Sequence, residues 1–510
     1  MAGVSFFSLV ILPITFSLYF VGLAVYRLYF HPLSKIPGPK FAALTRWYEC
    51  YYDVLCWPGG KYMHIVNRLH DTHGPVVRVG PSEVHIKDRD YVETLFCSAS
   101  VGTRHKFEPA ARITGTPLGI FGTVDHTMHK NRRAAVSSFF SKKAADDIEP
   151  LIHEKANVAC EVLKRQTNRD GKTDLRTVYL AFFTDIICSH AFNRPLDLLQ
   201  NEREAKRWRE AISALAMLTP LVRQFPWLIP TAIKLPIPFW NLIYPALGRV
   251  VQLHREAGEK SITRAEDMTL TKRPALFRTI LSSNLPIEEK SLGRLSHESL
   301  VFVGAGGETC ARHMTNATYY ILANQDRVLP RLRKELDSVM PSADTMVSSY
   351  DLQKLPWLNS IIRETLRVTA LVTSRLPLVA PEPLSHPGSG YTIPSGYAVS
   401  MTLRDILRDP AIYPAPNEFR PERWLESSPA ELEKMNKFYL PFSRGSRACM
   451  GIYLAYAQLH ILIATVFRRL ELELEDVLFE RDIESNRDCF VGETSIHSAG
   501  VFVKAMERTV

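Results

Sequence analysis

The chain has 510 residues, of which 46% are hydrophobic and 23% are charged, and its formal net charge is +9. This composition excludes a disordered polymer and allows a large buried core. The Lys and Arg residues are dispersed, which argues against nucleic acid as a partner and fits either solubility or weak attraction to an anionic surface. The eight cysteines show no C-x-x-C pair and no zinc-ligand spacing, so we expect a reducing compartment rather than a disulfide framework.

The N-terminal stretch from Ala2 to Tyr26 contains no charged residue. A membrane-spanning helix needs roughly 17–25 apolar residues, so this stretch is long enough. The alternative is a cleaved signal peptide, but no basic residue precedes the stretch and no A-x-A site follows it. Because Arg27, Lys35 and Lys40 come after it, the positive-inside rule leaves the rest of the chain in the cytosol. We predict a retained single-pass anchor at residues 1–27.

The segment 28–40 ends in HPLSKIPGPK, whose three prolines cannot continue a helix. We therefore predict a stiff hinge here, followed by one large domain over residues 41–510. An average of about 150 residues per domain would suggest three domains. However, no Gly/Ser-rich linker, internal repeat or low-complexity block divides this part of the sequence.

The body of the chain alternates between helical and β-like patterns. Residues 74–88, GPVVRVGPSEVHIKD, contain two Val- and Ile-rich runs separated by a Gly-Pro pair, which predicts two strands. From about 144 to 340 the pattern is mostly helical, and DLQKLPWLNSIIRETLRV, residues 351–368, predicts a further helix. Beyond it, Pro, Gly and β-branched residues predict small sheets and turns, and a last long helix follows Gly451. The expected fold is mainly α with a minor β part.

VGAGGETC, residues 303–310, places three glycines inside a predicted helix, where each costs about 1 kcal/mol relative to alanine. A helix accepts this cost when a ligand must approach its backbone, or when another helix packs closely against it. Thr309 follows the glycines. The hydroxyl of a helical threonine can donate to the carbonyl four residues earlier and distort the helix, which would open the groove further.

Glu364 and Arg367 are three residues apart on the predicted helix and therefore share one of its faces. The usual fate of such a pair is an exposed ion pair worth about 0–1 kcal/mol. A buried network is the alternative, and the five donors of Arg would allow it to bridge several partners there. The spacing alone favours the exposed pair.

PFSRGSRACMG, residues 441–451, fills the pattern F-x-x-G-x-R-x-C-x-G with Phe442, Gly445, Arg447, Cys449 and Gly451. At roughly 5% usage per residue type, chance matches in a chain of this length number on the order of one in ten thousand. Cys449 stands just before a helix, whose N-terminus favours a thiolate, the form that binds iron. Gly445 allows a tight turn, Gly451 lets a flat macrocycle lie close to the helix, and Arg447 can pair with a carboxylate.

This stretch resembles the haem-binding signature of the cytochrome P450 monooxygenases, in which the cysteine is the axial thiolate ligand of the iron in haem b. The resemblance extends over nearly the whole chain. Through HPLSKIPGPK and RVGPSEVHI it is closest to fungal microsomal members of secondary metabolism, of the trichodiene oxygenase type. It implies the cytochrome P450 fold, a helix-rich triangular haem-thiolate domain with small β-sheets, as the catalytic domain over residues 41–510.

The resemblance implies roles for two groups of helical residues. Glu364 and Arg367 would join Arg423, from the P-E-R-W element, in a buried network behind the haem. The presence of all three in this order favours the network over an exposed pair. Glu308 and Thr309 match the acidic residue and the threonine on the side where dioxygen binds, and the threonine there orders water and helps to deliver protons.

The resemblance also implies ligands for the haem propionates. His129 and Arg133 resemble W-x-x-x-R with His129 in place of the usual Trp, and His can still donate to a carboxylate. Arg375, in TSRLP, matches a further arginine of this kind. The departures from the common pattern are Cys310 in place of Thr or Ser, Leu378 in place of an Arg that many fungal relatives carry, and Gln458 in place of Glu.

For the substrate pocket, the resemblance implies apolar lining residues from several segments. They are Phe107, Ile120, Phe121, Phe302, Ala305, Val372 and Ile496. FPWLIPTAIKLPIPFW, residues 225–240, is long, apolar and interrupted by prolines, which would be an aggregation hazard on a soluble surface but fits a segment that dips into a bilayer. This predicts a lipophilic substrate that arrives from the membrane.

The expected activity is that of a haem-thiolate monooxygenase that inserts one oxygen atom from O2 into a lipophilic small molecule by hydroxylation or epoxidation, such as a fungal terpenoid or polyketide. GAGGETC is not a G-x-G-x-x-G after a strand, so it does not predict a nucleotide site. Electrons are therefore expected from NADPH–cytochrome P450 reductase, with cytochrome b5 as a further candidate partner, at the endoplasmic reticulum membrane with the catalytic domain in the cytosol.

Two other functions are open alternatives. A haem-thiolate isomerase or dehydratase would need no reductase, but such members tend to lose the threonine that Thr309 matches. A non-catalytic haem-binding sensor would not need an acid and a threonine on a glycine-rich helix. Consumption of NADPH in the presence of the reductase distinguishes the three functions.

Overall fold

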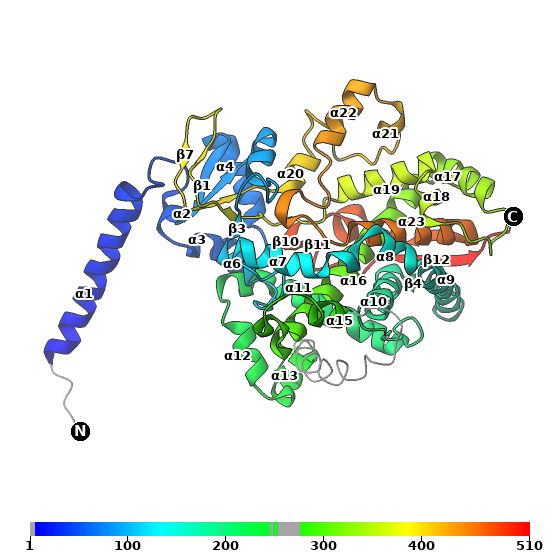
Figure 1. The fold of residues 1–510 in the computed structure, drawn as a ribbon, viewed down its shortest axis with the longest axis horizontal. Helices are drawn as coiled ribbons and strands as arrows, with labels where there is room; N and C mark the ends of the chain where they lie inside the picture. The colour runs from blue at the N-terminus through cyan, green and yellow to red at the C-terminus, as the bar shows by residue number, and fades with distance from the viewer. Residues whose placement is uncertain are drawn as a thin grey trace.

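The computed structural model describes residues 6–193, 195–243, 245, 248–249, 251–252 and 276–509. Helices dominate it, as the sequence predicts (Figure 1). The helices are α1 (Phe6–Val25), α2 (Lys40–Leu44), α3 (Trp47–Cys50), α4 (Tyr62–His73), α5 (Val92–Leu95), α6 (Glu108–Ala111), α7 (His126–Val136), α8 (Lys142–Asp147), α9 (Glu149–Asp170), α10 (Leu175–Phe192), α11 (Glu202–Gln224), α12 (Leu228–Lys234), α13 (Ile237–Ile243), α15 (Leu276–Leu281), α16 (Leu292–Ala323), α17 (Gln325–Val339), α18 (Ser349–Leu352), α19 (Pro356–Thr369), α20 (Leu403–Leu407), α21 (Arg423–Glu426), α22 (Pro429–Lys437) and α23 (Ile452–Arg469).

Within the described residues the strands are short and form four small sheets. They are β1 (Val76–Gly80), β2 (Glu83–Ile86), β3 (His105–Lys106), β4 (Thr173–Asp174), β5 (Leu378–Val379), β6 (Leu384–Ser385), β7 (Thr392–Ile393), β8 (Ala398–Ser400), β9 (Leu470–Glu475), β10 (Arg487–Cys489), β11 (Val491–Glu493) and β12 (Phe502–Glu507). The described strands pair in the orders β1-β2-β8-β5-β3, β4-β12-β9, β10-β11 and β6-β7. The two strands predicted within 74–88 are confirmed as the antiparallel pair β1 and β2.

The main hydrophobic core lies where α9, α10, α16, α19 and α23 meet. Its largest fully buried side chains include Phe182, Phe183, Trp357 and Phe467. A second core covers the five-stranded sheet, which lies on the side of the body nearer to α1 (Figure 1). The sequence pattern predicted one helix over 351–368, but the structure divides it into α18 and α19. The reason is Pro356, which lacks an N–H and therefore begins a new helix instead of continuing one.

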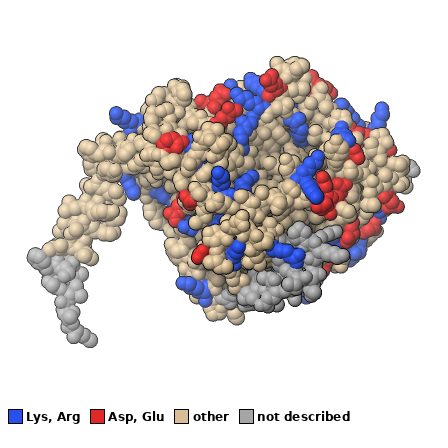
Figure 2. Space-filling view, in the orientation of Figure 1, with Lys and Arg blue, Asp and Glu red and all other residues tan. Residues whose placement is uncertain are grey.

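The N-terminal helix projects away from the body (Figure 1). Residues Ile11–Phe30 have a mean hydropathy of 1.6 and none of them is buried, so this helix is long and apolar enough to cross a membrane. Figure 2 shows the described length of α1 without Lys, Arg, Asp or Glu side chains, and basic residues where it joins the body. The structure therefore fits the predicted anchor, with its charged flank on the side of the folded domain.

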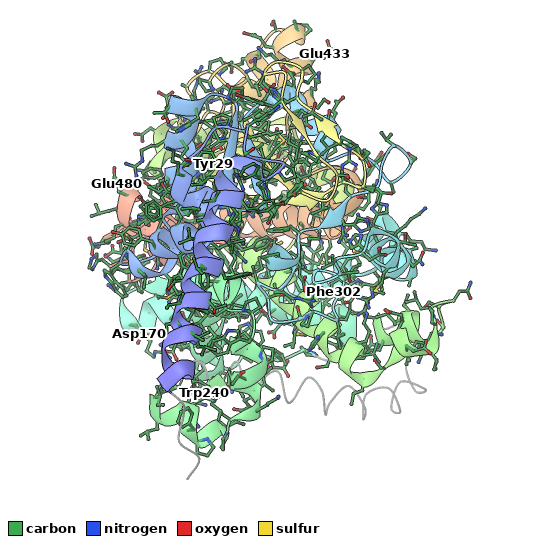
Figure 3. The ribbon with its side chains drawn as sticks, turned by 90° about the vertical axis from the view of Figure 1, so that its left-hand side faces the viewer. Tyr29, Asp170, Trp240, Phe302, Glu433 and Glu480 are labelled. Carbon is green, nitrogen blue, oxygen red and sulfur yellow. The ribbon has the colours of Figure 1, made fainter. Side chains whose placement is uncertain are left out.

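A second apolar surface is formed by α12 and α13. Trp227 is 60% exposed and Leu242 is 86% exposed, and α12 lies at 120° to the preceding helix α11. Figures 1 and 3 share their vertical axis, and in both the free end of α1 and the region around Trp240 lie on the lower side of the molecule. One bilayer can therefore contact both elements, as the sequence pattern of 225–240 predicts.

Candidate active site

The loop that carries Cys449 is fixed by its own backbone. Gly445 has φ +77°, and a Cβ at this position would overlap the carbonyl oxygens of residues 96 and 97, so only glycine fits. The N–H of Cys449 donates to the carbonyl of Phe442 at 2.9 Å. Because α23 begins three residues after Cys449, the thiol lies at the N-terminal end of a long helix, as the sequence predicts.

Cys449 faces a space inside the protein. Its side chain is exposed, yet burial raises the pKa of its thiol, while the N–H of Gly451 lowers it. On α16, Ala305 is exposed in the middle of a core helix, and a Cβ added at Gly304 or Gly451 would meet nothing within 4 Å. Burial and then the nearby Cys449 raise the pKa of Cys310, also on α16, to about 12. An interior space therefore separates the thiol from the glycine-rich part of α16.

Basic side chains gather beside the Cys449 loop. They are Arg447, Arg133, His129 and Lys106. Arg447 donates to the carbonyls of residues 123 and 124 at 2.6 and 2.9 Å, and Arg133 donates to the carbonyl of Ala448 at 2.6 Å. Burial and then these neighbouring cations lower the pKa of His129 to about 2. Within the described residues, no carboxylate forms an ion pair with Arg447, Arg133 or Lys106.

Two of the three glycines in α16 serve helix packing. A Cβ at Gly306 would lie 3.0 Å from Ile187, and one at Gly307 would lie 2.7 Å from Thr184 Oγ1, both on α10. Only Gly304 borders open space. Of the two alternatives, close helix packing therefore applies to Gly306 and Gly307, because α10 approaches too closely to allow side chains there, and ligand approach stays open for Gly304.

Thr309 lies on the face of α16 that borders the interior space. It follows Ala305 by one helical turn and is half-buried. Its Oγ1 donates to the carbonyl of Ala305 at 2.8 Å, which confirms the predicted bond to the residue four positions earlier. Because this bond uses the only hydrogen of the hydroxyl, Oγ1 can accept a hydrogen bond from a water molecule but cannot donate one to it.

Glu364, Arg367 and Arg423 form a fully buried network. Arg367 donates from Nε and Nη2 to the two carboxylate oxygens of Glu364 at 3.0 and 2.8 Å, and Arg423 Nε donates to Glu364 Oε1 at 2.9 Å. Trp424 Nε1 also donates to Glu364, at 3.0 Å. The remaining donors of Arg367 bind carbonyls of the segment 407–418. The exposed ion pair that the spacing alone favours is therefore not formed.

A family model for cytochrome P450 matches residues 50–493 of the chain. The chain belongs to the cytochrome P450 family. N-acetyltryptophan 6-hydroxylase of Emericella nidulans is 34% identical over 506 residues, which cover 98% of this chain and 97% of the relative. Tryptophan 6-hydroxylase of Fusarium equiseti is 36% identical over 502 residues, 98% and 97% of the two chains. A cytochrome P450 monooxygenase of Sordaria araneosa is 32% identical over 509 residues, 97% of each chain.

As a cytochrome P450 similar to named monooxygenases of fungal secondary metabolism, the protein is a haem-thiolate monooxygenase. Its reaction uses O2, a small-molecule substrate and electrons from a redox partner. The residues around Cys449 fit haem. The interior space lies between the thiol and α16, and the cations suit two propionates. These propionates would also bind the buried Arg447 Nε, which has no hydrogen-bond partner among the residues that the structure describes. Cys449 would then ligate the iron, which deprotonates a coordinating thiol.

The carboxylate of Glu308 is clamped by two arginines that the sequence analysis missed. Arg176, on α10, pairs with Glu308, and Arg312 Nε lies 3.2 Å from the same oxygen. Glu493, on β11, pairs with Arg312 at 2.7 Å and with Arg176 at 3.4 Å. The second oxygen of Glu308 is buried and has no hydrogen-bond partner among the described residues. Glu308 therefore lies in a group of two arginines and two glutamates.

A polar cavity of about 470 Å³ leads to this group of charges. Its walls include Arg176, Arg312 and Glu493, together with Thr177 on α10 and Lys206 on α11. Ile496 also lies on its wall, beside Glu493, because the chain after β11 turns toward this cavity. Ile496 therefore borders this cavity, and its place in the substrate pocket stays a prediction.

Arg375 lies in a different cluster from the one expected. Its Nε and Nη2 donate to Glu83 and Glu49 at 2.9 and 2.8 Å, and only its buried Nη1 is without a partner among the described residues. In the same cluster Arg223, from the end of α11, lies 3.1 Å from Asp488. Because two carboxylates occupy the Arg375 guanidinium, the prediction that it binds a haem propionate is not supported.

The remaining predicted pocket residues have the following contacts, and their place in the substrate pocket stays a prediction. Phe302 and Ile120 are buried in one hydrophobic cluster, and the ring of Phe302 lies 4.9 Å from that of Phe140 (Figure 3). Phe121 is half-buried and meets the ring of Phe490, which the sequence analysis missed, at 5.2 Å. The remaining members contact neighbouring strands: Val372 bridges Val491, and the N–H of Phe107 donates to the carbonyl of Pro377.

Proposed function

We propose that this cytochrome P450 hydroxylates or epoxidises an uncharged, lipophilic fungal metabolite, such as a terpenoid or a polyketide. The proposal places it at the endoplasmic reticulum membrane, with an anchor at 1–27, a hinge at 28–40 and a cytosolic catalytic domain at 41–510. Its electrons would come from NADPH–cytochrome P450 reductase, with cytochrome b5 as a further candidate donor. The observation that supports the proposal is that the free end of α1 and the apolar surface of α12 and α13 lie on the same side of the molecule.

The charges beside the pocket favour an uncharged substrate over an amino acid. Two of the relatives are named as hydroxylases of tryptophan or N-acetyltryptophan, both of which carry a carboxylate. Here Arg223 and Arg375, beside the segment that carries Val372, are already surrounded by carboxylates. These are Glu49, Glu83, Asp53 and Asp488, with Arg46 as a third neighbouring cation. Four carboxylates already surround three arginines here, so this cluster has no unpaired positive charge to attract a further anion.

Within the proposed reaction, bound haem supplies the activation of oxygen, and the chain supplies binding and protons. Cys449 would hold the iron, and the apolar residues around Ala305 and Phe121 would hold the substrate and exclude water. Thr309 would position a water molecule, and Glu308 would supply protons from the polar cavity once it leaves its arginine clamp. An isomerase or a sensor would have no use for this proton path.

The substrate class is testable with a defined panel. The full-length chain and its reductase are incubated with NADPH and with terpenoids, polyketides, tryptophan, N-acetyltryptophan and the methyl ester of N-acetyltryptophan, and the products are identified by mass spectrometry. We expect oxidation of neutral apolar compounds and, among the indoles, preference for the ester. Preferred oxidation of the free acids would overturn the proposed substrate class while leaving the monooxygenase activity established.

Replacing Thr309 with Ala should separate NADPH consumption from product formation. The variant loses the hydroxyl that positions water but keeps Cys449 and the cation cluster, so reduction and substrate binding should continue. We expect the yield of product per NADPH to fall about 100-fold, the lower end of what positioned proton transfer contributes, with hydrogen peroxide formed instead. Thr309→Ser, which retains the hydroxyl, is the matched control. An unchanged product yield in Thr309→Ala would indicate that Glu308 or Cys310, and not Thr309, delivers the protons.

Deleting residues 1–26 should release much of the protein from membranes while haem binding is retained, because the folded domain does not pack on α1. Residual, salt-resistant binding should persist through α12 and α13 and should disappear when Trp227 and Leu242 are also replaced by Ser. Sedimentation of membranes before and after an alkaline carbonate wash measures both effects. A truncated protein that stays in the washed membranes would mean that another segment crosses the bilayer.

A further inference from the structure

Lys106 lies directly opposite Leu378 in the sheet. The antiparallel strands β3 and β5 pair His105 with Val379 and Lys106 with Leu378. Side chains of directly opposite residues lie on the same face of a sheet, about 4.5–5.5 Å apart at Cβ. Leu378 is apolar, so Lys106 provides the cation of this facing pair, on the face that an arginine at position 378 would share.

The amine of Lys106 lies inside the protein but is not fully covered. The side chain is half-buried, yet burial and then Arg447 lower the pKa of its amine well below the usual value. Both observations fit a group on the wall of an internal space, accessible to a small molecule and far from bulk water. Its Nζ donates to the carbonyl of Phe121 at 2.8 Å and lies 3.1 Å from the centre of that ring.

Two arginines provide the positive charge around Lys106, whereas His129, whose pKa is lowered to about 2 by burial and the neighbouring cations, is neutral. The groups that face it or its neighbours are Arg447, Arg133, His129 and His126. Among the described residues the one acid that acts on this group is Asp125, which favours the charged form of Arg447 and also pairs with His105. These cations donate to carbonyls, but burying three of them beside a single acid is costly, so the group fits a ligand that brings about two negative charges.

We propose that Lys106 binds a propionate carboxylate of the haem. Its amine, which extends from β3, would lie where the guanidinium of an arginine at position 378 on β5 would lie. Arg447 and Arg133 would bind beside it, so that three cations share the two propionates of one haem. A charge-assisted hydrogen bond of this kind is short and strong, and it restores the charged form of the lysine. The same amine could instead receive a carboxylate of the substrate, which the experiment must distinguish.

The test measures the cofactor rather than the activity. Lys106→Met removes the cation with little change of shape, Lys106→Met/Leu378→Arg returns a cation from the opposite strand, and Lys130→Met, an exposed lysine on α7, is the control. Each full-length protein is loaded with haem, and transfer of the haem to an excess of apomyoglobin is followed. Resonance Raman spectra report the propionate bending modes, and redox titration reports the midpoint potential.

For Lys106→Met we expect haem transfer to be about 10-fold faster or more, the loss associated with one hydrogen bond to a charged group, and shifted propionate modes. The double variant Lys106→Met/Leu378→Arg should restore the transfer rate and the propionate modes, and Lys130→Met should change neither of them. Lys106→Gln retains a neutral donor, so its rate of haem transfer should be intermediate. This variant also tests the proposal if the Met variant does not accumulate. If Lys106 served only to pack against Phe121, Leu378→Arg on the opposite strand would not restore haem retention.

Two results would overturn the proposal. In the first, Lys106→Met and Lys106→Gln retain haem and the propionate modes like the unchanged protein. In the second, haem retention is unchanged, but the variants bind free N-acetyltryptophan or laurate more weakly without losing affinity for their methyl esters. That result would assign Lys106 to a substrate carboxylate, and it would also count against an uncharged substrate without affecting the monooxygenase assignment.

Discussion

Replacing Cys449 with Ala should abolish the strongly red-shifted Soret band that thiolate-ligated haem shows after reduction and binding of carbon monoxide. The expected loss is complete, because the thiolate is the one protein ligand proposed for the iron. Cys449→His should also lose this band, even where an imidazole replaces the thiolate, since the shift depends on the sulfur. The measurement is the reduced, carbon-monoxide difference spectrum of full-length protein in membranes.

The other cysteines provide matched controls for this prediction. Six of them are buried and Cys56 is half-buried, so Cys449 is the one exposed cysteine among the residues that the structure describes. Cys310→Ser is the most demanding control, because Cys310 lies on α16 close enough to influence Cys449. All seven single variants should retain the red-shifted band. If Cys449→Ala kept it, another cysteine would be the ligand and the assignment of the 441–451 loop would be wrong.

Replacing Arg367 with Ala should prevent accumulation of the folded holoprotein. The change leaves Glu364 buried and Arg423 with a weakened partner, and it also removes the donors that hold the carbonyls of the segment 407–418. Breaking a buried ion pair costs about 3–5 kcal/mol, a large part of the roughly 5–15 kcal/mol that stabilises a typical domain. Yield of haem-loaded protein and its thermal denaturation measure the effect.

The chain contains a control with the same spacing in a different environment. Asp351 and Lys354 are also three residues apart and paired at 2.8 Å, but each side chain is 56% exposed. Lys354→Ala should therefore give normal amounts of spectrally native protein. Arg367→Lys tests the geometry, because a lysine cannot reach the carboxylate and the carbonyls at once, and it should fail like the alanine variant. Native yields of Arg367→Ala would show that the network contributes little to folding.

Much of this site was predictable from the sequence because its residues are close together in the chain or belong to a dense motif. The Cys449 loop is an uninterrupted segment whose turn requires Gly445. The bond from Thr309 to Ala305 follows from helix geometry alone. The packing of Gly306 and Gly307 was not predictable, since a glycine pattern does not show whether a ligand or a helix such as α10 fills the groove.

Contacts between distant segments account for what the sequence analysis missed. Arg312 follows Glu308 by four residues, so helical spacing was a sufficient signal for that contact. Arg176 is 132 residues from Glu308 in the chain, and no local pattern connects them. For the same reason Arg375 looked like a free cation, although its partner Glu49 lies 326 residues away. An ion pair of this kind is defined by the fold, and one sequence carries no record of it.

The cations beside Cys449 should affect the half-life of the protein in the cell when haem is scarce. A newly made chain without haem would hold Arg133, Arg447 and Lys106 together with Asp125 as the one acid that acts on them among the described residues, and the repulsion between these cations would weaken the 441–451 loop. Cofactor binding removes that repulsion, and any ligand that binds the folded state alone increases its population. We therefore expect turnover to depend on haem supply: blocking haem synthesis should shorten the half-life of the unchanged protein in a pulse-chase experiment. A variant in which Lys106 and Arg133 are both replaced by Gln should respond less, because its haem-free form has less charge to relieve.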